Sequence, residues 1–138
     1  MRAKPDDIMD VDDDAAEQTL SLTGITAGTG ENQTLRVTAV SDNTDVLADP
    51  TVTYSSADTT ASLAYTPIDN EFGQATVTVT VTDAGHNGTF DDFDDASVIR
   101  TFIVTVANAP TLAAINDPTA IDEDAGLQTV NMSGISPG

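Results

Sequence analysis

The feature that most constrains this chain is an internal repeat. Residues 11–28, with the sequence VDDDAAEQTLSLTGITAG, return without a gap as residues 121–138, IDEDAGLQTVNMSGISPG, at an offset of 121 − 11 = 110 positions. Self-similarity at a fixed spacing marks a repeat architecture, and a unit of this length has the size of one independent domain. The sequence therefore predicts one complete repeat followed by the opening of the next.

The repeat divides the chain into four parts. Residues 1–7 form an N-terminal tail, residues 8–110 the complete repeat, residues 111–120 a linker, and residues 121–138 the first-strand segment of the following repeat. The linker is assigned because it follows Asn108-Ala109-Pro110 and precedes the acidic opening of the second copy. A unit of this size can bury a single hydrophobic core.

The composition excludes several classes of partner. The formal net charge is −19, from 23 acidic residues against four basic ones, and this charge repels nucleic-acid phosphates and anionic lipids. We therefore expect no nucleic-acid partner and no direct membrane insertion. No cysteine is present, which excludes disulfides and thiolate metal sites. No apolar run reaches the length of a membrane helix, and the first residues lack the apolar segment of a secretory signal. Any export signal is therefore expected elsewhere in a parent chain.

Short strands are predicted by hydrophobic alternation. In residues 75–83, ATVTVTVTD, alanine and valine alternate with threonine, which is typical of a strand with one buried and one solvated face. Five further alternating segments are Leu20 and Leu22; Leu35, Val37 and Ala39; Val52 and Tyr54; Leu63 and Tyr65; and Phe102, Val104 and Val106. Turn-forming residues separate these segments at short intervals, and no segment has a helical period.

Six regularly spaced strands in a unit of about 110 residues indicate an all-β fold. We predict an antiparallel Greek-key β-sandwich of the immunoglobulin-like or cadherin-like kind, with about seven strands. The seventh strand is expected either from residues 8–11 or from the partial repeat at the C-terminus.

Three stretches carry a resemblance to a known family. They are the opening IDEDAGLQTVNMSGIS, the centre SLAYTPIDNEFGQATVTVTVTD and the close VIRTFIVTVANAPT. Together they resemble the cadherin-like, immunoglobulin-like repeats found in tandem in very large bacterial surface and secreted proteins. The resemblance implies an extracellular, calcium-associated module with an adhesive or spacer role.

The resemblance also assigns individual positions. Glu123 stands where cadherin-type repeats place a calcium-binding glutamate near the domain start, and Asp13 occupies that place in the first copy. Asp83 stands at the acidic position that ends the long Thr/Val strand, and Asn108 stands in the interdomain linker. The linker departs from the family pattern, because Asn108 is followed by alanine and proline instead of an acidic neighbour.

Two clusters of carboxylates are candidate calcium sites. The first, Asp10-Val11-Asp12-Asp13-Asp14, places four carboxylates in five positions, and Ca²⁺ requires six to eight oxygen ligands. Asp83 or Asn87 from a neighbouring loop is expected to complete its shell. The other interpretation of this cluster is a charged strand edge that prevents unwanted pairing, and acidity in general also keeps a protein soluble.

The second cluster is Asp91-Asp92-Phe93-Asp94-Asp95, inside a long loop that begins at Asp83. It lacks the ligand spacing of an EF-hand, so it predicts a calcium loop of another geometry. The loop phenylalanines have two interpretations, packing onto the sandwich edge or an exposed contact patch. The full set of candidate calcium ligands is Asp10, Asp12, Asp13, Asp14, Asp83, Asn87, Asp91, Asp92, Asp94, Asp95, Asn108, Asp122, Glu123 and Asp124.

No constellation indicates catalysis. His86 is the only histidine, so it lacks both a partner for acid–base work and the nitrogen or sulfur co-ligands of a zinc site; it is interpreted as an exposed turn residue. No serine occupies a nucleophile elbow. The sequence therefore predicts a protein that is not an enzyme.

Three functions fit these features. The first is a structural and adhesive repeat of an extracellular or cell-surface bacterial protein, stiffened by Ca²⁺ and bound to neighbouring copies and to a surface glycan or protein. The second is a filament subunit that donates its C-terminal segment to the open sheet edge of another copy; folding back of that segment on its own domain is the alternative. The third is a carbohydrate-binding module, which the absence of tryptophan disfavours.

Overall fold

The computed structural model describes residues 8–137 and contains seven β-strands and no helix within that range. The expected N-terminal tail, residues 1–7, and Gly138 lie outside the described residues. The strands are β1 (Ile8–Asp12), β2 (Gln18–Thr23), β3 (Leu35–Ser41), β4 (Thr51–Thr53), β5 (Thr60–Tyr65), β6 (Gly73–Asp83) and β7 (Ser97–Ala107). All six segments with alternating hydrophobicity are strands, and the seventh strand comes from the N-terminal segment.

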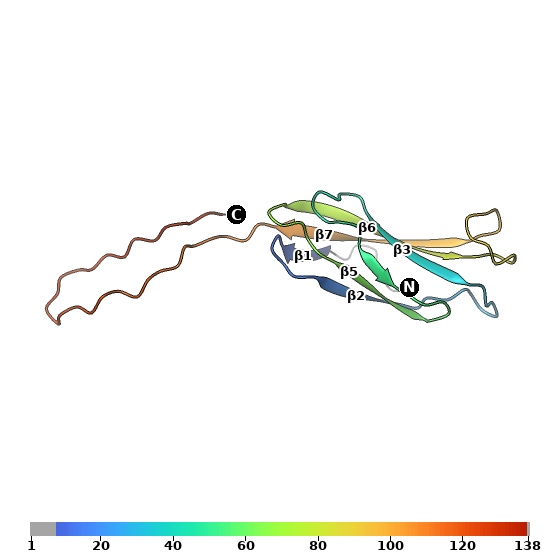
Figure 1. Ribbon diagram of the computed structural model, residues 1–138, viewed down its shortest axis with the longest axis horizontal. Helices are drawn as coiled ribbons and strands as arrows, with labels where there is room; N and C mark the ends of the chain where they lie inside the picture. The colour runs from blue at the N-terminus through green and yellow to red at the C-terminus, as the bar shows by residue number, and fades with distance from the viewer. Residues whose placement is uncertain (1–7, 138) are drawn as a thin grey trace.

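The strands form two sheets that pack as a β-sandwich (Figure 1). One sheet has four strands in the order β1-β7-β6-β3, and the other has three in the order β2-β5-β4. Every pair is antiparallel except β1 with β7, which run parallel. The all-β sandwich predicted from the sequence is therefore confirmed.

The core lies between the sheets and follows the alternation in the sequence. In β6 the side chains of Ala75, Val77 and Val79 are fully buried, while the threonines between them stay partly exposed. The period of two along an extended strand places alternate side chains on opposite faces, so β6 contributes one apolar face. Other strands add Leu22, Leu63 and Phe102 among the most buried side chains. Burial of each such side chain stabilises the fold by about 1.5–3 kcal/mol.

The two ends of the sandwich differ in what they carry. We call the end where β7 begins at Ser97 the loop end, and the end where β7 finishes at Ala107 the linker end. The β2–β3 and β6–β7 connections lie at the loop end, and the C-terminal segment leaves from the linker end (Figure 1). Eleven residues of β7 separate the two ends, which corresponds to about 33 Å at the usual rise of a strand.

Residues 114–132 run away from the sandwich and return toward it as a long extended excursion (Figure 1). The return is fixed to the linker by backbone hydrogen bonds. Thr111 N donates to Ser136 O at 3.0 Å, and Ala113 N donates to Ser133 O at 2.9 Å. The second copy of the repeated sequence therefore does not fold back onto the core of its own sandwich in this structure.

Candidate functional site

The connection between β6 and β7, residues 84–96, forms an extensively hydrogen-bonded polar structure at the loop end, and we call it the acidic loop. Asp83, the last residue of β6, lies at the neck of the loop, where its two limbs meet. One carboxylate oxygen of Asp83, Oδ1, accepts hydrogen bonds from Gly85 N and Ala96 N, each at 3.0 Å. Asp83 N also donates to Ala96 O at 2.9 Å. The carboxylate of Asp83 thus holds the two limbs of the loop together.

Asp94 and Asp95 organise the interior of the acidic loop through backbone N–H groups. Asp94 Oδ2 accepts from His86 N at 2.8 Å and from Asn87 N at 3.3 Å. Asp95 Oδ2 accepts from Asp91 N at 2.5 Å and from Asp92 N at 3.4 Å. Each carboxylate therefore uses one oxygen to satisfy loop donors that no strand partner serves.

Asp92 completes the acidic trio. Its Oδ2 accepts from the Asn87 side chain, with Nδ2 at 2.6 Å, and its Oδ1 accepts from Asp94 N at 3.2 Å. The hydrogen bond from the Asn87 side chain is the main cause that lowers the pKa of Asp92 below its ordinary value, because it stabilises the ionised carboxylate. Asp92 is therefore a carboxylate, with full negative charge, at neutral pH.

The trio leaves two oxygens without donors. One carboxylate oxygen from each of Asp92, Asp94 and Asp95 lies within 4.8 Å of the others. The Oδ1 atoms of Asp94 and Asp95 are inaccessible to solvent and have no hydrogen-bond partner. Buried acceptors are ordinarily paired, and gathered carboxylates repel one another without a cation. Hard oxygen ligands of this kind fit Ca²⁺, which binds carboxylates at 2.3–2.6 Å.

The loop is shaped by left-handed backbone at Gly85, Gly88 and Asp91. Gly85 has φ of +57°, and a Cβ placed on it would lie 2.5 Å from Asp94 Cγ. Asp91 has φ of +70°, a left-handed conformation that is uncommon for residues with a side chain. The close approach of the Asp94 carboxylate therefore depends on the missing side chain at Gly85.

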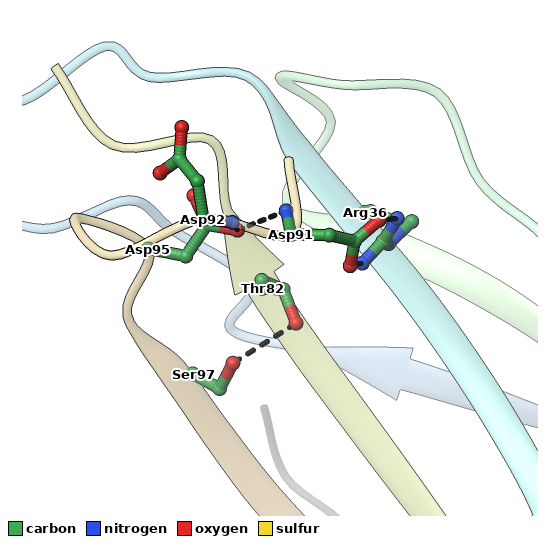
Figure 2. Close-up of polar contacts among 6 residues, drawn as sticks. All are labelled: Arg36, Thr82, Asp91, Asp92, Asp95 and Ser97. Carbon is green, nitrogen blue, oxygen red and sulfur yellow. Dashed lines mark hydrogen bonds and ion pairs between the residues drawn. The ribbon is translucent and has the colours of Figure 1, made fainter. Parts of the chain in front are cut away.

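Arg36 on β3 clamps the acidic loop from the adjacent strand. Its guanidinium donates to both carboxylate oxygens of Asp91, at 2.6 and 3.1 Å (Figure 2). The guanidinium also lies 4.6 Å from the ring centroid of Phe90. This hydrogen bonding lowers the pKa of Asp91 and raises that of Arg36. A second contact at the neck joins the hydroxyls of Thr82 and Ser97 at 3.0 Å (Figure 2).

The two loop phenylalanines behave differently. Phe90 is partly buried under Arg36, as the loop-packing interpretation requires. Phe93 is 95% exposed, so that interpretation is wrong for this residue. Phe93 lies between Asp92 and Asp94, which accept hydrogen bonds within the loop, and its ring is left exposed.

The other acidic cluster, Asp10 to Asp14, does not form a comparable group. Among the described residues 8–137, the aspartate trio of the acidic loop is the one set of three or more potential ligands that lie close enough for an ion. Asp10 and Asp12 belong to β1 and pair in register with Thr105 and Ala107. Carboxylates two apart on an extended strand are separated by about 6.6 Å along it. Extended backbone therefore separates Asp10 from Asp12, and Asp13 and Asp14 lie in the turn that follows β1.

The expected link between this cluster and Asp83 or Asn87 is also wrong within one molecule. Asp12 lies at the linker end beside Ala107, whereas Asp83 lies at the loop end, where β6 pairs with β3. The length of β7 separates them, about 33 Å. One ion cannot bridge that distance inside one sandwich.

The remaining predicted ligands lie at the linker end or beyond it. Asp13 and Asn108 line one pocket of about 230 Å³ together with Asn70 and Ser136. Asn108 Oδ1 is inaccessible to solvent and has no hydrogen-bond partner there. The acidic residues of the second copy, Asp122, Glu123 and Asp124, are exposed on the C-terminal excursion. The structure thus brings Asp13 and Asn108 together and leaves the second-copy carboxylates apart from both.

Sequence reasoning does not single out Arg36 or Gly85. Arg36 lies 55 residues from its partner Asp91, so only strand pairing brings the two together. The one sequence feature that could have drawn attention to Arg36 is the scarcity of basic residues, since Arg36 is one of four in a strongly acidic chain. For Gly85 the signal is its place two residues after a strand-ending aspartate, which is typical of a turn.

Comparison with known proteins gave no relative. No protein-family model, curated protein sequence or solved structure matched the chain significantly. The likeness to cadherin-like repeats therefore depends on the sequence motifs alone. Within residues 8–137, the structure has no helix with the length and apolar character needed to cross a membrane.

Proposed function

We propose that this chain is a non-enzymatic structural and adhesive repeat of an extracellular bacterial protein, and that its acidic loop binds Ca²⁺. The internal copy of residues 11–28 supports the tandem arrangement. Neighbouring copies of the repeat are the expected partners, with a surface glycan or protein as the adhesive ligand. Ca²⁺ then stiffens the loop end of each repeat.

The observation that carries the calcium proposal is the pair of buried, unpartnered oxygens, Asp94 Oδ1 and Asp95 Oδ1, beside Asp92. When bound, Ca²⁺ would supply the positive charge that these oxygens lack. Asp92, Asp94 and Asp95 would hold it. Their remaining oxygens and the neck carboxylate of Asp83 hold the backbone of the loop through the hydrogen bonds described above.

Weak calcium binding is expected of this site, and weak binding suits an extracellular setting. Three gathered carboxylates are fewer than the ligand set of a cytosolic sensor, and calcium sites in extracellular modules bind at about 10⁻⁴ to 10⁻³ M. A site of that affinity is occupied where calcium is abundant. The weak affinity expected of the acidic loop therefore favours an extracellular location.

Thermal unfolding with and without calcium tests the proposal. A ligand that binds only the folded state stabilises it by about 2.7 kcal/mol at 100 times its Kd. For a domain of about 100 residues the melting temperature should then rise by about 10–20 °C relative to chelator. Circular dichroism is suitable because the unfolding of an all-β domain removes its strand signal.

Matched double substitutions provide the control. Asp94→Asn with Asp95→Asn should abolish most of the calcium-dependent shift, whereas Asp12→Asn with Asp14→Asn should retain it. Both pairs remove two charges from a cluster of four aspartates, so general charge reduction is the same. Equal melting curves for the native chain in calcium and in chelator would show that the loop does not bind Ca²⁺.

A further inference from the structure

Residues 121–137, which we call the C-terminal arm, have the local shape of residues 11–27 as well as their sequence. Both copies form the same turn, in which Ala15 N donates to Asp12 O and Ala125 N donates to Asp122 O, each at 3.1 Å. Both form the same side-chain hydrogen bond, from Gln18 Nε2 to Ala16 O and from Gln128 Nε2 to Gly126 O, each at 2.8 Å. Both also have a left-handed glycine, Gly24 with φ of +72° and Gly134 with φ of +66°. The backbone of the arm is thus already bent as in the folded first copy.

The two copies differ in burial. Leu22 and Ile25 in the first copy are 0% and 2% exposed, while their counterparts Met132 and Ile135 are 60% and 68% exposed. The arm therefore presents core-type side chains at core-type positions with no core around them. Its position away from the sandwich agrees with this exposure (Figure 1).

The first copy shows which surface fits such a segment. Residues 18–23 pair along the whole of β5, and Ile25 N donates to Thr59 O at 3.0 Å. Residues 11 and 12 pair with Val106 and Ala107 at the end of β7. Because the repeat has no gap, the exposed apolar residues of the arm fall at positions that are also apolar in the first copy, except Leu127, which stands in the place of Glu17.

We propose that the C-terminal arm of one molecule docks on β5 and β7 of a second copy, in the place of that copy's residues 11–27. The exchange is heterologous, since the arm and its docking surface are different parts of the molecule. Repeated exchange therefore joins copies head to tail in an open chain. This inference stands independently of calcium binding.

The linker contacts favour a second copy over the arm's own sandwich. Thr111, just past the linker end of β7, is bonded to Ser136 and, through its hydroxyl, to Gly134 O at 2.8 Å. In the docked position, Ile135 would take the place of Ile25, which lies beside Thr59 at the loop end, just before β5 begins. The arm cannot reach the loop end of its own sandwich while these contacts hold. When the arm docks on a second copy, its contacts with the linker can persist. The arm then takes the place of β2, which is an edge strand and has no strand on its outer side among the described residues.

The resident β1–β2 segment limits how much exchange occurs. Its effective concentration is of millimolar order because it belongs to the same chain. A free arm therefore competes only at high protein concentration, or when the resident segment cannot dock.

The test uses the full chain with Leu22→Asp and Ile25→Asp, which remove the resident segment from the core. We expect this variant to fold by capturing arms of other molecules. Its melting temperature should rise when its concentration increases tenfold, and sedimentation should show dimers and longer species. Adding Met132→Asp and Ile135→Asp should leave the chain unfolded at every concentration. Adding Leu127→Asp instead should change nothing, since Leu127 is 98% exposed and corresponds to Glu17.

Two results would overturn the proposal. One is a Leu22→Asp/Ile25→Asp chain that folds as a monomer with a concentration-independent melting temperature, which would mean that the arm docks on its own sandwich. The other is a chain that stays unfolded up to about 1 mM, the range of the competing effective concentration. In native protein, weak association near that concentration should be lost in Met132→Asp/Ile135→Asp, which keeps the resident segment intact. Unchanged association there would also contradict the exchange.

Discussion

Two acidic segments of this molecule have nearly the same composition and quite different structures. Residues 10–14 and residues 91–95 each place four aspartates in five positions around one apolar residue. In the first, Asp10 and Asp12 lie on the extended backbone of β1, and Asp13 and Asp14 lie in the turn that follows it. The second belongs to a loop whose backbone N–H groups turn inward and collect carboxylate oxygens. The backbone path, and not the number of carboxylates, therefore creates a candidate ion site.

The loop achieves this geometry at identifiable positions. Gly85 allows the Asp94 carboxylate to lie against the backbone, and Asp91 takes a left-handed φ. Arg36 then fixes the outer side of the loop through Asp91. Residues 10–14 have none of these devices, because strand pairing already satisfies the backbone of β1.

Gly85→Ala should give the largest effect on this comparison. The added Cβ would clash with the Asp94 carboxylate, and the alanine would have to adopt φ of +57°. The expected loss in the free energy of unfolding is therefore about 1–3 kcal/mol. Gly88→Ala is the matched control, since Gly88 has φ of +73° and its added Cβ would have no other side chain or distant backbone within 4 Å. It should lose only the backbone strain, about 1 kcal/mol. Equal losses in urea unfolding would show that the approach of Asp94 does not matter.

The sequence predicts the fold better than the site because the two depend on different ranges of interaction. Alternation in a segment such as residues 75–83 is local, and it determines which face of β6 is buried. The sandwich follows from six such segments. The gathering of Asp92, Asp94 and Asp95 can be anticipated as a cluster, but its geometry depends on inward N–H groups that composition does not encode.

The errors have the same origin. Asp83 and Asp12 both lie at strand ends, yet the direction of the strands places them at opposite ends of the sandwich and not beside one ion. The contact between Arg36 and Asp91 is invisible in the sequence for the related reason that it joins a strand to a loop far along the chain. The pairing register of the strands determines both the separation of Asp83 from Asp12 and the contact of Arg36 with Asp91, and it cannot be read from the sequence.

Arg36→Met should have a smaller effect than Gly85→Ala and should act on the loop more than on the sandwich. The change removes the bonds to Asp91 and the cation–π contact with Phe90 while keeping most of the apolar stem. Exposed pairs contribute little to global stability, so we expect a severalfold faster amide exchange in residues 84–96 and almost no change in the melting temperature. Arg100→Met is the control, because Arg100 donates to the adjacent Ile99 O. Similar exchange in both variants would argue against the clamp.

The smallest expected effect is a pH dependence of loop stability in calcium-free buffer. Hydrogen bonds from Arg36 and from Asn87 lower the pKa values of Asp91 and Asp92, respectively, so both folded-state values lie below the unfolded value of about 3.9. The stabilisation is then fully present above the unfolded value and is lost as the pH falls through the folded values. Urea midpoints measured between about pH 5 and pH 2 should decline, and the decline should be shallower in Asp91→Asn with Asp92→Asn than in the native chain. Because both side chains are exposed, the difference should be small. Parallel profiles for the two proteins would mean that these hydrogen bonds do not persist in solution, and the contrast between the folded loop and the extended strand would then depend on Asp94, Asp95 and Gly85 alone.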